Sequence, residues 1–369
     1  MSYHRIPTDH SLGIQSTLNT TNSENNNTLR WLEGLPPGYF AVAMASGILS
    51  IAFDMIGQTL LAEGLFVAAL LAWVTMLGLS AWRLWRFPQA VKIDLLNIRR
   101  VFAFFTLVVS TNVVGILLHQ HGYPQLALAC WVFAFVVWSL LLYLSFSVLT
   151  FLTHPHTVNV VHGDWLTSII ATQSLVLQGV MIAPDLGIYT DYMLVEVHLL
   201  WLLGLVLYGI FVTLFCYRIF FQRFQPEDTS PLLWVIMGAA ASGVNAGTVL
   251  LQTSTPLSFL QALHPFIDGV AMLLWSWATW WIPMLVIFGV WKHGVRRYPL
   301  RYEPAMWSMV FPLGMYAVAS FRLGLAAEFP PLQWISLLIV WVGFAVWCLV
   351  LLGLCYRVYI NVISEKTPP

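Results

Sequence analysis

An almost unbroken apolar stretch runs from Pro36 to Ile360, and this feature constrains the fold more than any other. Hydrophobic residues make up 59% of the chain and charged residues only 9%, whereas a soluble domain carries about 25% charged residues. A chain with so few polar side chains cannot cover its own surface in water, so its solvent is lipid. We therefore predict an all-α polytopic membrane protein.

The apolar stretch divides into ten segments, each close to or above the length of about 20 residues that a helix needs to cross the hydrocarbon. Charge clusters and turn residues separate the segments. The predicted spans are 36–57, 60–82, 99–119, 125–152, 164–183, 192–217, 231–252, 259–291, 305–327 and 332–359. Short turns alternate with longer, basic loops between these spans, which predicts five helical hairpins.

The basic residues are distributed on one side of the predicted spans. Of the 16 Lys and Arg residues, 15 fall in the termini and the longer loops, and the exception is Arg322. Basic residues near span ends stay cytoplasmic, so both termini are expected in the cytoplasm, here of a bacterial inner (plasma) membrane. We expect a disordered cytoplasmic tail at 1–35, because residues 19–28 are rich in Asn, Thr and Ser. A ten-helix transmembrane domain at 36–360 and a cytoplasmic tail at 361–369 follow.

The five hairpins resemble one another in sequence. Each odd-numbered span has an aromatic residue near its start and a small or small polar residue seven positions later. These pairs are Phe40 and Gly47, Phe104 and Thr111, Trp165 and Thr172, Trp234 and Ala241, and Trp307 and Gly314. A unit that recurs at 61 to 73 residues indicates a ring or an array.

Polar and small residues concentrate in the odd-numbered spans, whereas the even-numbered spans are richer in Leu, Val and Trp. Because lipid offers no partner to a hydroxyl or an amide, these side chains turn inward. The concentration favours a shared polar surface around a central pathway, and the alternative is that the same residues hold helices together. The candidate pathway residues are Ser46, Gly47, Ser110, Thr111, Thr172, Gln173, Ala241, Asn245 and Gly314.

Such a pathway is expected to prefer anions. The middles of the odd-numbered spans contain no Asp or Glu, and Asp54 and Asp164 lie at span ends. Cation pathways normally carry acidic rings or carbonyl filters. The five odd-numbered helices also run in the same direction, and each N-terminus carries roughly half a positive charge. The formal net charge of zero argues against a nucleic-acid partner.

Two segments carry a resemblance to a known family. The ninth span contains Trp307, Phe311 and Pro312 in a Trp-x3-Phe-Pro pattern, and the first span begins Pro36-Pro37-Gly38-Tyr39-Phe40. Both segments resemble the tellurite-resistance/dicarboxylate transporter (TDT) family, which includes plant slow anion channels and fungal malate and sulfite transporters. The resemblance extends over the whole membrane region.

This resemblance implies five hairpins around a quasi-fivefold central pore, with the odd-numbered helices inside, and a homotrimer in which each protomer has its own pore. It places the family's gating phenylalanine at Phe311. A basic residue eleven positions later corresponds to Arg322, which would draw anions to the outer mouth; the alternative is snorkelling to the interface. Pro312 removes a backbone donor and is expected to kink the helix beside the ring of Phe311.

The expected function is transport of small anions, such as C4-dicarboxylates, chloride, nitrate or sulfite, through a channel-like pore, without enzymatic activity. The alternative is a proton-coupled dicarboxylate or sulfite carrier. For that mechanism His264 and Asp268 are the candidates, because they lie one turn apart in the eighth span; a structural contact between helices is the other interpretation.

No cofactor or metal is expected. The pairs His119 and His121, and His154 and His156, lie in loops or at span ends without a carboxylate or Cys cluster nearby in sequence. A haem-binding membrane oxidoreductase remains a third class. It would need histidines that face each other inside the bilayer, whereas most of the ten His residues lie in the N-terminal tail, loops or span ends. The sequence leaves the identity of the anion open.

Overall fold

The structure is a computed structural model that describes residues 29–152, 163–221, 225 and 229–364. The described residues form helices and turns, with no strand among them, which confirms the predicted all-α class for this part of the chain. The predicted tail at 1–28 and the pair His154 and His156 lie outside the described residues.

Nine helical segments within the described ranges are long and apolar enough to cross a membrane. One of them, Gly163–Phe221, contains two helices, because Gly187 in the connecting turn η5 (Ala183–Tyr189) adopts a left-handed φ of 56°. The nine segments therefore hold ten long helices, which form hairpins in chain order.

Five of the long helices are buried and alternate with five that lie at the outside. The buried helices, named the inner helices, are α3 (Ala41–Met55), α6 (Phe105–Gln120), α8 (Thr167–Ile182), α10 (Val235–Gln252) and α13 (Trp307–Ala326). The others, named the outer helices, are α4 (Thr59–Arg86), α7 (Pro124–Phe151), α9 (Thr190–Phe221), α12 (His264–Val290) and α14 (Pro330–Ser364). In four inner spans, 72–83% of the most apolar stretch is buried, against 22–33% in four outer spans. In the joined segment, α8 is buried along nearly its whole length and α9 along one side.

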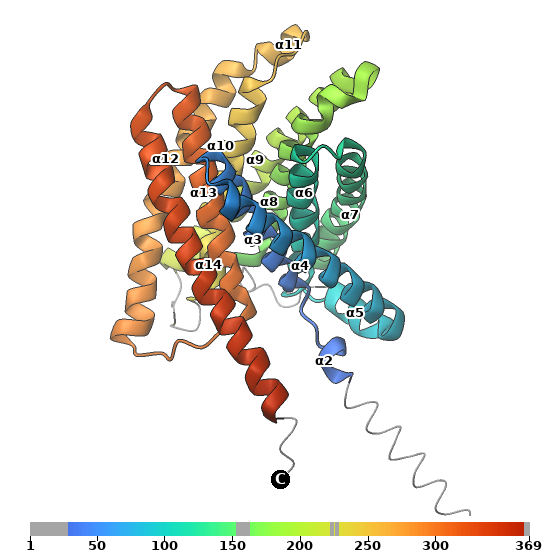
Figure 1. The fold of residues 1–369 in the computed structure, drawn as a ribbon, viewed down its shortest axis with the longest axis vertical. Helices are drawn as coiled ribbons and strands as arrows, with labels where there is room; N and C mark the ends of the chain where they lie inside the picture. Colours follow the sequence, from blue (N-terminus) through green and yellow to red (C-terminus); the bar gives the residue numbers. More distant parts are fainter. Residues whose placement is uncertain (1–28, 153–162, 222–224, 226–228, 365–369) are drawn as a thin grey trace, which may run out of the picture.

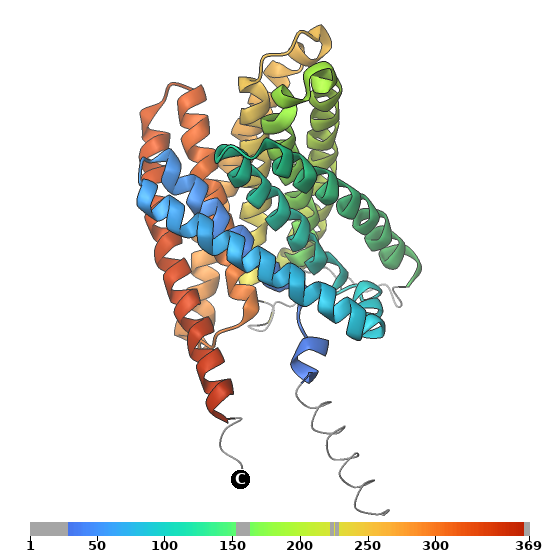
Figure 2. The same ribbon diagram turned by 45° about the vertical axis from the view of Figure 1, so that its right-hand side comes forward.

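The inner helices pack against one another in cyclic order. Each inner helix contacts the next one along the chain, and α13 contacts α3. Each also packs against the outer helix that follows it, so the hairpins stand side by side with their second helices on the outside (Figures 1 and 2).

Basic residues gather at one end of the molecule, among them Arg83 and Arg86 in the last turn of α4 and Lys92 in α5 (Pro88–Leu95). The short helices α2 (Arg30–Glu33) and α5 and the last turns of α14 lie at this end, named the basic end (Figure 1). The small helix α11 (Ser258–Gln261) and the turn between α13 and α14 lie at the opposite end (Figures 1 and 2). Arg322 lies in the last turns of α13, toward the opposite end.

A 3-10 turn precedes each inner helix and makes the predicted repeat visible. The turns are η1 (Pro37–Phe40), η2 (Val101–Phe104), η4 (Gly163–Leu166), η7 (Pro231–Trp234) and η9 (Pro304–Met306). The aromatic residue of each repeat lies in this turn or directly after it. Proline occupies the first position of η1, η7 and η9, where its missing N–H costs no hydrogen bond.

The outer helices tie the inner helices together through tryptophan. In every repeat, an indole N–H of the outer helix donates a hydrogen bond to the inner helix of the following repeat, and the last bond joins α14 to α3. The donor and acceptor pairs are Trp73 and Thr111, Trp138 and Thr172, Trp201 and the Gly243 carbonyl, Trp275 and Ser320, and Trp347 and Ser46, at 2.9–3.0 Å. We name these five bonds the indole girdle.

Several helix boundaries differ from the sequence prediction. The eighth span divides into α11 and α12, because Pro265 near the start of α12 favours a new helix there. Residues 30–33, within the predicted tail, form α2, whose Leu32 is fully buried. The last helix continues to Ser364, past the predicted end at 359.

Candidate functional site

A cavity of about 230 Å³ opens among the starts of the inner helices at the basic end. Every inner helix or the turn that precedes it contributes to its wall. Representative lining residues, one from each inner helix, are Met44, Thr106, Thr167, Val235 and Ser308. Because the five helix N-termini converge on this cavity, their backbone dipoles make it favourable to anions.

Phe311 and Pro312 line the same cavity and lie among the deepest of its residues, counted from the helix starts. The Phe311 side chain is fully buried. Pro312 lies inside α13, where it removes a backbone donor, and its ring packs against Gly238 of α10. A Cβ at Gly238 would lie 2.7 Å from Pro312 Cγ, so this close approach requires a glycine.

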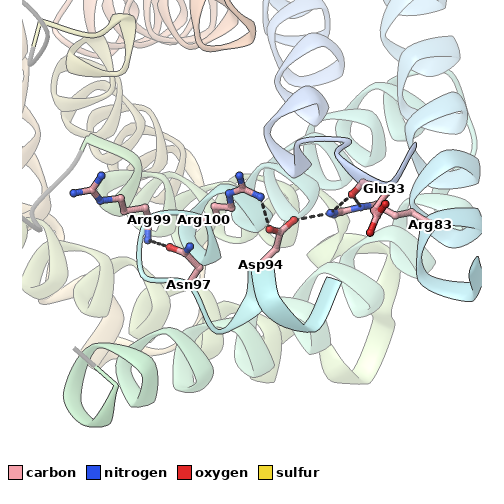
Figure 3. A network of polar contacts seen from close by, with 6 residues as sticks. All are labelled: Glu33, Arg83, Asp94, Asn97, Arg99 and Arg100. Carbon is pink, nitrogen blue, oxygen red and sulfur yellow. Dashed lines mark hydrogen bonds and ion pairs between the residues drawn. The ribbon is translucent and has the colours of Figure 1, made fainter. Parts of the chain in front are cut away.

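An ion-pair network centred on the buried Asp94 lies at the mouth of the cavity (Figure 3). The carboxylate of Asp94, 2% exposed, accepts from Arg83 at 2.7 Å and from Arg100 at 2.6 Å. Arg83 also donates to the backbone carbonyl of Glu33, and the Arg99 backbone N–H donates to Asn97 Oδ1 (Figure 3). The network joins α2, α4, α5 and the segment before η2.

The two arginines at the mouth therefore differ in their charge environment. Arg99 and Arg100 both line the cavity. Arg100 is paired with Asp94, whereas within the described residues no carboxylate forms an ion pair with Arg99. The guanidinium of Arg99 is therefore exposed and without a carboxylate partner among the described residues.

Arg322 and Asn245, predicted at different places, are in direct contact. Arg322 Nη1 donates to Asn245 Oδ1 at 2.8 Å, and Asn245 Nδ2 donates to Met315 Sδ at 3.2 Å. Arg322 therefore lies between α13 and α10 and is only partly exposed. It follows Phe311 by eleven residues, which is about three turns or 16 Å along the same side of α13.

The hydroxyls of Ser46, Thr111 and Thr172, predicted to line the pathway, accept the indole N–H groups of the girdle. Gly47 and Gly314 lie at contacts between inner helices, where a Cβ would collide with Val113 and Ile48 respectively. These five residues therefore make contacts between helices, which is the alternative to a pathway role that the sequence analysis left open.

The remaining candidates are also held by internal contacts. Ser110 Oγ donates to its own helix at the Leu107 carbonyl, and Gln173 Nε2 donates to the Trp201 carbonyl at 3.4 Å. Ala241 is fully buried. A pathway role for the set stays a prediction.

His264 and Asp268 line a shallow cavity at the opposite end, together with Gln252. Within the described part of the chain, His264 Nε2 is buried without a hydrogen-bond partner, and no hydrogen bond joins it to the exposed Asp268. The structure therefore does not bring these two groups into the contact that the helical spacing allows.

The histidines of the first loop pair have carboxylate neighbours that are distant in sequence. His119 Nε2 lies 2.6 Å from Asp185 Oδ2, and His121 Nε2 lies 3.2 Å from Glu63 Oε1. The sequence neighbourhood of these histidines did not reveal the two carboxylates, because Asp185 and Glu63 lie far from them along the chain. Among the described residues, no group of three or more His, Cys, Asp and Glu side chains could hold a metal ion.

Two features of the site escaped sequence reasoning. Asp164, noted only as a residue at a span end, faces the cavity. The girdle donors recur at 63 to 74 residues in the even-numbered spans, and this periodicity could have been found from the sequence. No comparable periodicity in the sequence predicts the ion pair between Asp94 and Arg83.

The chain is similar in sequence to known membrane proteins. Residues 34–355 match the family described as voltage-dependent anion channel. Over 141 residues the chain is 38% identical to an uncharacterized membrane protein of Mycobacterium tuberculosis, matched in two strains; this is 38% of the chain and 71% of that protein. It is 22% identical over 200 residues to an uncharacterized transporter of Methanocaldococcus jannaschii, which covers 54% of the chain and 57% of that relative.

Proposed function

Because the chain belongs to the voltage-dependent anion channel family, which is the TDT family, we propose that it is a passive channel for small anions. In this proposal the inner helices surround a quasi-fivefold pore that runs from the basic end to the opposite end. The cyclic packing of the inner helices supports this arrangement. So does the cavity at the basic end, because all five repeats contribute to its wall.

The observation that carries the proposal is the position of Phe311 in this cavity. Its ring lies among the deepest lining residues and is fully buried, next to the helix proline Pro312. An aromatic ring closes a narrow passage with few rotatable bonds, and a rotamer change is sufficient to open it. Phe311 is therefore the proposed gate between the cavity and the rest of the pore.

Arg322 provides the proposed attraction beyond the gate. Its guanidinium lies about three turns past Phe311 on the same side of α13, and Asn245 holds it by a hydrogen bond. Among the described residues, no carboxylate forms an ion pair with it. An unneutralised positive charge in this position lowers the energy of an anion that has passed the gate.

The assembly and orientation are part of the same proposal. The outer helices expose many large apolar side chains, among them Leu140, Leu273 and Leu349. We propose that these surfaces face lipid and neighbouring protomers of a homotrimer, with the basic end and both termini in the cytoplasm of a bacterial inner membrane. The molecular mass of the detergent-solubilised protein tests the trimer.

Anion flux in proteoliposomes tests the channel proposal. Chloride, nitrate, sulfite, malate and succinate are compared at a clamped membrane potential, with and without a pH gradient. A passive channel moves anions only down their electrochemical gradient, and a protonophore leaves this flux unchanged. Uphill anion movement driven by the pH gradient would instead support the proton-coupled carrier. Its loss in Asp268→Asn would then assign the coupling to that residue.

A further inference from the structure

The cavity at the basic end contains a carboxylate that an anion pathway does not obviously need. Asp164, half-buried in η4 directly before α8, is the one acidic residue among the described residues that line the cavity. Within the described part of the chain, no side chain forms a hydrogen bond or an ion pair with it. When it is ionised, its carboxylate therefore acts on whatever occupies the cavity.

The positive charges of the same wall do not neutralise Asp164. Arg100 is paired with Asp94, and Arg99 forms no ion pair with a described residue. Arg99 precedes the aromatic residue of its repeat, Phe104, by five positions, whereas Asp164 precedes Trp165 by one. In the repeats, Asp164 therefore lies four positions closer to the start of its inner helix than Arg99 does.

We propose that Asp164 is a specificity-determining residue that makes the pore prefer monovalent over divalent anions. The proposal rests on the anion-channel function and adds a substrate class to it. Coulomb repulsion is proportional to the charge of the permeating ion, so the carboxylate opposes a dianion twice as strongly as a monoanion. The attraction by Arg99 at the mouth concentrates both kinds of anion, and Asp164 then discriminates between them.

The test compares sulfate with nitrate, because both keep a fixed charge over the working pH range. Asp164→Asn removes the charge with little change of shape. The sulfate-to-nitrate flux ratio in proteoliposomes is expected to rise about threefold, since one additional unit of charge no longer meets the carboxylate. Asp164→Ser serves as a second neutral variant if the asparagine variant does not assemble.

Two control variants separate charge from local structure. Asp164→Glu retains the charge and is expected to keep the wild-type ratio. Asp54→Asn removes an exposed acid at the end of α3, away from the cavity, and should also leave the ratio unchanged. Arg99→Gln removes the attraction at the mouth and should lower the ratio, which is a change of the opposite sign.

The possible outcomes distinguish this proposal from the channel proposal. An unchanged sulfate-to-nitrate ratio in a neutral Asp164 variant that still conducts nitrate would overturn the role of Asp164 and leave the channel intact. A wild-type protein that conducts none of the tested anions would overturn the channel proposal itself.

Discussion

The inner and outer helices use their polar side chains in opposite ways. The inner helices are mostly buried and contain most of the buried hydroxyl and amide side chains, whereas the outer helices are largely exposed and apolar. Even so, the outer helices supply every indole donor of the girdle, and three of its acceptors are inner-helix hydroxyls that the sequence assigned to the pathway. A polar side chain on a buried membrane helix therefore does not by itself indicate a pathway. Its hydrogen-bond partner shows whether it faces a neighbouring helix or the centre of the inner helices.

The largest expected effect comes from the face of α13 that lines the cavity. Phe311→Ala removes the buried ring between the cavity and the rest of the proposed pore, so we expect anion conductance to rise at least about tenfold, as the removal of a barrier of about 1.4 kcal/mol would do. Chloride flux at equal reconstituted protein measures the change.

Phe105→Ala is the matched control for this experiment. Phe105 is equally buried, in the first turn of α6, but packs against Phe102 and does not line the cavity. Its truncation should lower stability without raising conductance. Equal conductance in both variants would mean that Phe311 is an ordinary core residue.

The second effect concerns the charge beyond the gate. Arg322→Glu reverses the charge that Asn245 holds between α10 and α13, and flux is expected to fall about fivefold at low ionic strength and less at high salt. Arg322→Lys keeps the charge and should retain most of the flux. Normal flux of Arg322→Glu at low salt would show that Arg322 only connects α10 and α13 and does not attract anions.

Features that depend on residues close together in the sequence could be predicted, whereas contacts between distant segments could not. The membrane class, the ten spans and the alternation of buried and exposed helices follow from local apolarity and charge, so they could be predicted. The ion pair between Arg83 and Asp94 and the contact between Arg322 and Asn245 join residues from different elements. Helical periodicity does not specify such pairs, because it describes one helix at a time.

The candidate site shows the same division. Phe311 and Pro312 carried a recognisable pattern, and the structure places both in the cavity wall. The direction in which Ser46 or Thr172 points depends on a neighbouring helix, which sequence polarity alone did not reveal. Asp164 was visible as a charge at a span end, but its cavity is formed by five separate segments of the chain.

The third prediction compares glycines of the two helix classes. A Cβ at Gly314, on an inner helix, would lie 2.7 Å from Ile48 Cγ2, whereas a Cβ at Gly78, on an outer helix, would meet nothing within 4 Å. Gly314→Ala is therefore expected to lower the free energy of unfolding by about 1–3 kcal/mol through overpacking. Gly78→Ala should be neutral or slightly stabilising, because alanine favours the helix. Unfolding in mixed detergent micelles measures both, and equal effects would contradict the tight inner packing.

The smallest expected effect is that of the bond that closes the indole girdle. Trp347→Phe keeps an aromatic ring in α14 but removes the N–H that donates to Ser46 Oγ at 2.9 Å, so we expect a loss of about 1 kcal/mol in the free energy of unfolding. Trp334→Phe, on the same helix but 70% exposed, is the matched control and should cost less stability.

A double variant tests whether Trp347 and Ser46 act through this one bond. Ser46→Ala should lose a similar amount of stability, and the double variant should lose little more than either single variant. Fully additive losses would show that the two side chains stabilise the fold separately. If Trp347→Phe changed anion conductance as much as Phe311→Ala does, the girdle would act on the pore itself. That result would contradict the view that the outer helices only support the inner ones.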